Sequence, residues 1–197
     1  MVRELTTDAA LRGKVIPLAF HVDYWDRLGW RDPFSAADWT HRQQVYAAAL
    51  HLPSAYTPQM VVNGTRQFVG SNGHALDAAL ADETKQPPFG SVSVSATRDG
   101  NALAAKVTAT APSSAEVVLT VFENSLITKV EAGENSGWTI DNEAVVRRLV
   151  KVGSGPVDTT VSIPLDKAWN PAHLGVAAFL QDRKTMAIRG AAVAGVR

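Results

Sequence analysis

Short runs of alternating apolar and polar residues dominate the chain after Gln86, and a period of two restricts that part to half-buried strands. Turn signals such as Asp99-Gly100 separate the runs. Several short strands of this kind predict a β-sandwich over residues 87–197. Glu143–Val152 fits a helix or a strand. The predicted strands cover residues 92–96, 103–109, 117–121, 174–180 and 188–196.

Residues 1–86 carry a different pattern, in which strand-length apolar runs are separated by helical segments. Val15–Val22 predicts a strand, and Pro17 places it at a sheet edge because proline donates no ladder hydrogen bond. The segment order predicts an α/β domain, which a Gln86-Pro87-Pro88 linker joins to the sandwich. The remaining predicted elements are a helix capped by Ser35 and ending near His51, a strand at Gln59–Val62, a type I′ turn at Asn63-Gly64, a return strand at Arg66–Val69, and a helix capped by Ser71 and ending near Glu83.

Charge and hydropathy exclude two classes of partner. The chain of 197 residues has 19 Lys and Arg against 19 Asp and Glu, so it lacks the basic excess typical of nucleic-acid binding. No apolar run approaches the ~20 residues that a membrane-spanning helix needs. The first residues are charged and lack an apolar stretch, so the sequence as written predicts no export signal and a cytoplasmic location by default.

The chain contains no cysteine. Disulfides, thiolate metal sites and a cysteine nucleophile are therefore excluded for these residues. The sequence also lacks G-x-S-x-G, H-E-x-x-H and P-loop motifs. We therefore predict no catalytic residue, no metal site and no cofactor from motifs.

His21 and Asp23 are two residues apart on the first predicted strand, so both side chains would share one face. There they could orient a nucleophile, accept protons or hold a metal. The alternative is a polar strand end with a hydrogen-bonded histidine, since two ligands are too few for a closed metal site. The other histidines show no ligand spacing.

Two loops carry further candidate binding residues. Trp25, Trp30 and Phe34 lie in a loop that contains glycine and proline, where they form either an aromatic rim around a peptide groove or a cap over the core. Glu134 and Asn135 lie between two glycines. That loop is either a turn that bonds its own backbone or a second binding element.

Residues 19–34 (AFHVDYWDRLGWRDPF) and 56–64 (YTPQMVVNG) are distinctive. Together with weaker similarity at 123–126, 133–137 and 145–149, they resemble a bacterial, mostly exported, thioredoxin-like family catalogued as domain of unknown function 1223. The resemblance implies a thioredoxin-like fold for residues 1–86 and a periplasmic or secreted location. It also implies a cis bond at Thr57-Pro58 that exposes backbone for an extended peptide, whereas the sequence alone favours a trans turn there.

The family's chemistry depends on residues that this chain does not show. Its members usually begin with a strand leading into Cys-x-x-Cys at a helix N-terminus, where a thiol becomes a reactive thiolate. Met1–Leu5 matches the end of that helix, so the resemblance implies a thioredoxin-like domain truncated at its N-terminus. Asn142 also stands where the family pattern has histidine.

Two functions remain as hypotheses. The first is a thioredoxin-like protein that is redox-inactive as written, from a family resembling exported thiol–disulfide oxidoreductases. The alternative is a non-enzymatic module that binds an extended peptide or protein through the Pro58 loop and the sandwich. A metal-dependent role for His21 and Asp23 ranks third.

The implied missing strand has a structural consequence. In thioredoxin-like sheets it is central, between the strands that match Val15–Val22 and Gln59–Val62. Without it, the two flanking strands pair directly, a partner supplies a strand, or this half is loosely folded. We expect loose folding of the isolated chain.

The absence of cysteine generates the first prediction. The purified chain of residues 1–197 should not reduce insulin disulfides, because it offers no thiolate to attack them. Turnover above a no-protein control, in a preparation free of thioredoxin, would contradict it.

Overall fold

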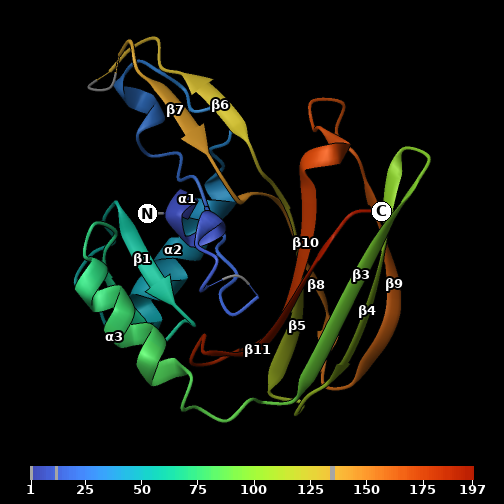
Figure 1. Ribbon diagram of the computed structural model, residues 1–197. Coiled ribbons are helices and arrows are strands. Elements are labelled where there is room, and N and C mark those ends of the chain that lie inside the picture. The colour runs from blue at the N-terminus through green and yellow to red at the C-terminus, as the bar shows by residue number, and fades with distance from the viewer. Residues whose placement is uncertain (1, 12, 134–135) are drawn as a thin grey trace.

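The structure, a computed structural model, describes residues 2–11, 13–133 and 136–197. This described part is a mixed α/β fold with antiparallel sheets, and none of its helices is long and apolar enough to cross a membrane. Its helices and strands are α1 (Val2–Thr7), α2 (Ala37–Ala49), β1 (Gln59–Val62), β2 (Arg66–Val69), α3 (Gly73–Glu83), β3 (Ser91–Asp99), β4 (Ala102–Thr110), β5 (Ala115–Glu123), β6 (Leu126–Lys129), β7 (Thr139–Asn142), β8 (Val145–Ser154), β9 (Val157–Pro164), β10 (Leu174–Asp182) and β11 (Ile188–Gly195) (Figure 1).

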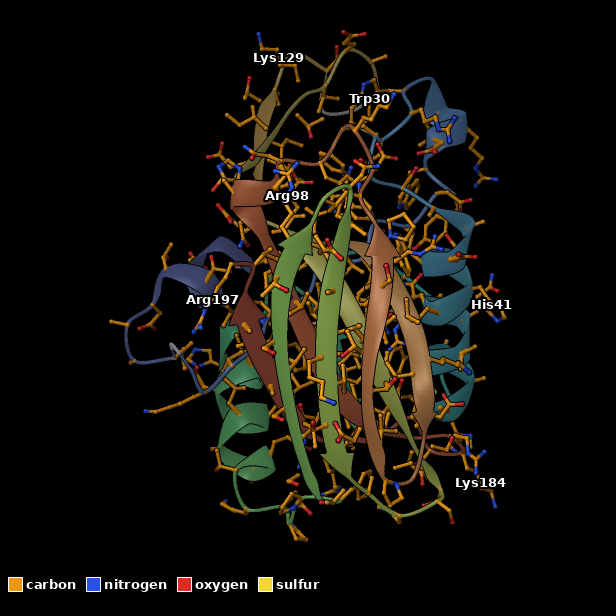
Figure 2. The ribbon with its side chains drawn as sticks, turned by 90° about the vertical axis from the view of Figure 1, so that its right-hand side faces the viewer. Trp30, His41, Arg98, Lys129, Lys184 and Arg197 are labelled. Atoms are coloured by element: carbon orange, nitrogen blue, oxygen red, sulfur yellow. The ribbon has the colours of Figure 1, made fainter. Side chains whose placement is uncertain are left out.

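Two antiparallel sheets pack against each other in the C-terminal half. One has the order β11-β10-β5-β8 and the other β3-β4-β9. Side chains from both, among them Leu103, Leu119 and Val176, form one buried core. Figure 2 shows the three-stranded sheet in front, with His41 projecting from α2 at the side. The predicted strands that correspond to β3, β4, β5, β10 and β11 are confirmed, and each supplies apolar residues to this core.

Other strands carry weaker sequence signals. Glu143–Val152 resolves into strand β8, since it pairs with β5 along its length. Strand β9 was not predicted: its polar residues face solvent and only Val157, Val161 and Ile163 contact the core. The β6–β7 hairpin was also missed and projects beyond the two sheets (Figure 1).

The β1–β2 hairpin lies in the N-terminal half, and Leu5 of α1 and Leu76 of α3 pack with Val62 on one of its faces. Its turn is as predicted: Asn63 and Gly64 have φ of 48° and 70°, and the Thr65 amide donates to the Val62 carbonyl at 3.1 Å. A Cβ on Gly64 would lie 2.0 Å from the carbonyl oxygen of Met186, so only glycine fits this contact with the β10–β11 loop.

Both predicted helix caps are wrong by one residue. Helix α2 begins after Ala36, which makes no side-chain cap bond. The predicted cap, Ser35, lies one residue earlier, and its hydroxyl donates to Asp26 at 2.7 Å. Helix α3 is capped by Asn72, whose side-chain oxygen accepts the Ala75 amide at 3.0 Å, in place of Ser71. The helix ends lie close to the predicted positions.

The predicted strand at Val15–Val22 is wrong. The segment makes only one parallel bridge to β8, in which Ala19 donates to Ala144 at 2.8 Å and accepts from Val146 at 2.9 Å. By strand alternation the backbone of Pro17 faces β8, as that of Ala19 does, but proline has no N–H with which to extend the ladder. The His21 carbonyl accepts the Ala36 amide instead, so the ladder stops after one residue.

Two rows of backbone groups in the described residues have no hydrogen-bond partner. Leu18 and Phe20 alternate with Ala19 and so point away from β8. On the other side, the Gly70 amide donates to the Pro58 carbonyl at 2.9 Å. By the register of the hairpin, the backbone groups of Met60 and Val62 then face β2, and those of Gln59 and Val61 face away from it. The two segments do not pair directly with each other in this part of the chain.

Several hydrogen bonds cross the predicted domain boundary at residues 86/87. The Ile188 amide donates to Asn63 at 2.7 Å, and the Gln181 side-chain amide donates to the Tyr46 hydroxyl at 2.8 Å. The N-terminal elements therefore rest on β10 and β11, and the division into two domains stays a prediction.

The unpaired rows generate a hydrogen-exchange prediction. Amides of Leu18, Phe20 and Val61 should exchange at least about a hundredfold faster than those of Val117–Val121, which strands bond on both sides. Local opening energies range from near zero to the global ~5–15 kcal/mol, so this contrast is measurable by native-state exchange. Equal protection in a monomeric chain would show that the first half is as firmly folded as the sheets.

Candidate functional site

A cavity of about 1150 Å³ separates the 15–22 segment from β1. The unpaired residues Leu18, Phe20, Gln59 and Val61 all line it. The cavity therefore lies between two rows of free backbone donors and acceptors. Apolar or aromatic side chains from other elements complete its wall, among them Leu5, Leu76, Leu80, Trp39, Tyr46, Phe179 and Ala191.

The cavity has a different wall on each face of the hairpin. On one face, α1 and α3 contribute Leu5 and Leu76, which pack with Val62. On the other face lies α2, whose Trp39 contacts Phe20 edge-on with ring centroids 5.3 Å apart. A group placed between the two rows therefore meets apolar side chains on both faces, with Arg42 and Gln43 of α2 also in the wall.

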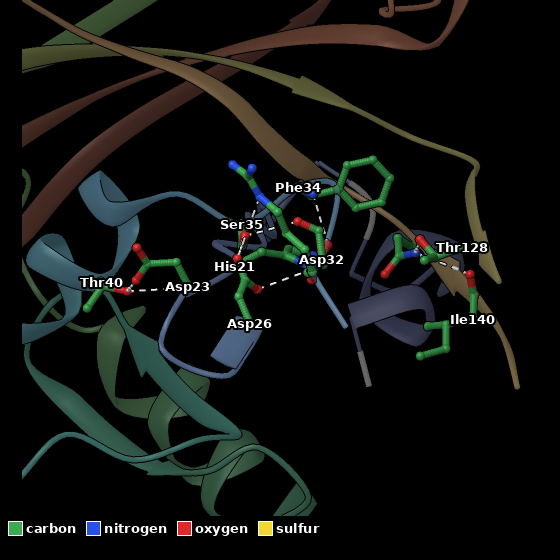
Figure 3. A network of polar contacts seen from close by, with 11 residues as sticks. His21, Asp23, Asp26, Asp32, Phe34, Ser35, Thr40, Thr128 and Ile140 are labelled. Atoms are coloured by element: carbon green, nitrogen blue, oxygen red, sulfur yellow. Dashed lines mark hydrogen bonds and ion pairs between the residues drawn. The ribbon is translucent and has the colours of Figure 1, made fainter. Parts of the chain in front are cut away.

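His21 and Asp32 form a hydrogen-bonded pair beside this cavity. Nδ1 of His21 lies 2.6 Å from Oδ2 of Asp32, and the Phe34 amide donates to Oδ1 at 2.9 Å (Figure 3). Burial raises the pKa of Asp32, but the hydrogen bond and charge of His21 and the Phe34 amide outweigh it and leave this pKa below its ordinary value. Asp26 extends the network by accepting from the Asp32 amide and the Ser35 hydroxyl.

His21 and Asp23 have separate partners. The Thr40 hydroxyl donates to Asp23 at 2.6 Å, and Figure 3 shows this pair apart from the His21–Asp32 group. The chain turns directly after residue 22, so the two side chains do not share a strand face. No group of three potential metal ligands occurs among the residues that the structure describes.

The aromatic loop contacts the proline loop. Nε1 of Trp25 donates to the Thr57 hydroxyl at 2.8 Å, although half of the Trp25 side chain is exposed. The Thr57-Pro58 bond is cis, as the family resemblance implied. Trp25, Trp30, Thr57 and Pro58 all line the cavity. The other two candidates, Glu134 and Asn135, lie outside the described residues.

Sequence reasoning missed two residues of this site. Asp32 was not among the predicted site residues, because it lies in a loop before Pro33, eleven residues from His21. Arg42 interrupts the apolar face of α2, and the structure places it in the cavity wall. A cation on the buried face of a helix was the available signal. Asn142, the departure from the family pattern, donates to the Thr128 hydroxyl at 2.9 Å in the β6–β7 hairpin.

The lowered pKa of Asp32 predicts a pH-dependent stability. Asp32→Asn should reduce the free energy of unfolding by about 1.5–3 kcal/mol near neutral pH, the usual contribution of a hydrogen bond to a charged group. A carboxylate with a lowered pKa stabilises above its ordinary value of 3.8, and this contribution is lost as pH falls below it. The difference between wild type and variant should therefore shrink below pH 3.8 in denaturant titrations.

The control for this experiment is Asp77→Asn, which changes an exposed carboxylate of α3. It should leave the unfolding free energy nearly unchanged across the same range. A constant difference between wild type and Asp32→Asn down to pH 2 would contradict the assigned charge of Asp32.

Comparisons with known proteins give one structure and one family. A crystal structure of a protein from Agrobacterium tumefaciens, a structural genomics target, is similar with a TM-score of 0.74 and 25% identity. The match covers 98% of this chain and 83% of that one. A search of curated proteins found no significant match. The model of a protein family of unknown function, DUF1223, matches residues 1–181, and the chain therefore belongs to the DUF1223 family.

Proposed function

We propose that this chain is a binding module that takes up an extended polypeptide segment as an added β-strand. The carrying observation is the pair of unpaired backbone rows, Leu18 with Phe20 and Gln59 with Val61, on opposite sides of a cavity of about 1150 Å³. A strand has donors and acceptors on both edges and matches two such rows at once. The mode is β-strand addition, here between two segments of the same chain.

Energetics favour an occupant with a peptide backbone. Leu18, Phe20, Gln59 and Val61 are partly buried, and a strand would give their backbone groups partners on both sides of the cavity. The cavity also exceeds the ~300–1,000 Å³ typical of small-molecule sites. An apolar small molecule would fill space but leave the amides of Leu18 and Val61 unbonded.

The proposal includes a thioredoxin-like architecture for the first half. Its supports are the order of α2, the β1–β2 hairpin and α3, and the cis bond before β1. Because the chain has no cysteine, we assign the Pro58 loop a role in binding and none in thiol exchange. An exported location, which the family resemblance implies, belongs to the proposal as well.

Peptide binding tests the proposal directly. The probes are acetylated and amidated octapeptides with a central run of Val and Ile and a lysine at each end. The matched control has the same side chains with alternate amides N-methylated, which removes half of its backbone donors. The unmodified peptides should bind and slow exchange at Leu18, Phe20 and Val61, and the methylated ones should not.

Two proline variants locate the strand. Val61→Pro removes an N–H that faces the cavity and spares the β1–β2 ladder, so peptide affinity should fall about tenfold or more. Val69→Pro is the matched control, because its N–H faces the other edge of the same hairpin. It should leave affinity unchanged.

Three results would overturn the proposal: no binding by any peptide, equal binding of methylated peptides, or equal loss of affinity in both proline variants. Equal binding of methylated peptides would indicate a site for apolar side chains alone.

A further inference from the structure

We infer that the inserted strand carries a carboxylate side chain beside Phe20, where it pairs with Arg42. This inference rests on the proposed function and specifies which strands the cavity selects. The acid stands within an otherwise apolar segment, since apolar side chains predominate in the cavity wall.

Arg42 lacks an anionic partner among the described residues. Its Nη2 donates to the Tyr46 hydroxyl at 3.0 Å and to the Gln181 side-chain oxygen at 3.2 Å, and both acceptors are neutral. Its Nε is buried without an acceptor. Arg42 as a whole is partly buried, and its Nη1 has no hydrogen-bond partner in the described part of the chain and is not fully buried, so Nη1 is the donor that a ligand in the cavity can reach. A guanidinium suits hydrogen bonding to a carboxylate.

Aromatic rings hold the guanidinium in place but do not satisfy it. Its central carbon lies 5.1 Å from the ring centroid of Tyr46, 5.4 Å from that of Phe20 and 5.8 Å from that of Phe179. Ring faces attract the cation, yet they accept no in-plane hydrogen bond from Nη1. The side chain is therefore oriented in advance, with hydrogen-bonding capacity left over.

The neighbouring row of backbone groups sets the position of the acid. The Phe20 side chain points to α2, where it meets Trp39. A residue paired directly opposite Phe20 points its side chain to the same face, with Cβ atoms about 4.5–5.5 Å apart. Arg42 stacks on Phe20 at that face, so an acid at this strand position lies next to the guanidinium.

Other charges that line the cavity already have partners or lie at its edge. Asp32 pairs with His21, and Glu83 accepts from the Thr65 hydroxyl at 2.6 Å. Asp26 accepts from the Ser35 hydroxyl. Lys14 is exposed. Arg42 is therefore the lining cation best placed to select an acid.

The test compares three octapeptides that differ at one central position, Glu, Gln or Lys, within the same Val and Ile run. Isothermal titration with the wild-type chain should show the Glu peptide binding about tenfold more tightly than the Gln peptide, and the Lys peptide most weakly. Arg42→Gln should abolish the preference for Glu over Gln while the Gln peptide still binds. Arg42→Lys, which keeps the charge, should retain part of the preference.

Arg98→Gln is the matched control, since Arg98 is exposed on β3 and its Nε bonds the nearby Gly100 carbonyl. It should keep the full preference for Glu. If Arg42→Gln does not fold, the wild-type comparison and Arg42→Lys still decide the question.

The outcomes separate the inference from the proposed function. Equal affinity for the Glu and Gln peptides overturns the inference and leaves strand binding intact. A preference that survives Arg42→Gln also overturns it, because another group must then recognise the acid. Failure of all three peptides to bind overturns the proposed function together with the inference.

Discussion

The need of extended backbone for hydrogen-bond partners on both edges governs the N-terminal half of this molecule. Strands normally meet that need by pairing on both edges, as β5 does between β10 and β8. The 15–22 segment and β1 each pair on one edge, and Leu18, Phe20, Gln59 and Val61 face a cavity with the other. The candidate binding residues lie at the same cavity, because the loops that carry Trp25 and Pro58 both line it.

The two C-terminal sheets provide the rigid support. Strand β10 is buried along nearly its whole length, since one face meets the β3-β4-β9 sheet and the other receives the N-terminal elements. Arg42 and Tyr46 reach across to Gln181 on β10, and Ile188 of β11 holds the hairpin turn at Asn63. The cavity thus has a fixed wall on the β10 side, while its two open backbone rows belong to segments with few hydrogen bonds of their own.

Sequence reasoning succeeded where a local rule decides the structure. Alternation predicted the strands that face the shared core, and Asn63-Gly64 predicted a turn that positive φ at both residues confirms. It failed where tertiary partners decide. Pro17 was expected to move a strand to a sheet edge, yet it reduced the pairing to one bridge at Ala19. The Asp32 partner of His21 is eleven residues away across a loop, and the rings around Arg42 come from three elements, so no spacing rule connects them.

The energetics of the proposed strand insertion bear on where an occupant would come from. Pairing with both rows supplies a few backbone hydrogen bonds, each worth about 0.5–1.5 kcal/mol net, and ordering a free peptide costs about 1–2 kcal/mol per residue. Backbone pairing alone therefore gives a separate chain little affinity, and burial of apolar side chains must supply the rest. A segment tethered to this chain would avoid most of the association cost, because a short linker provides an effective concentration of about millimolar. A strand from another molecule depends more on side-chain selection, and that is the case in which a charge held on three rings at Arg42 contributes most to specificity.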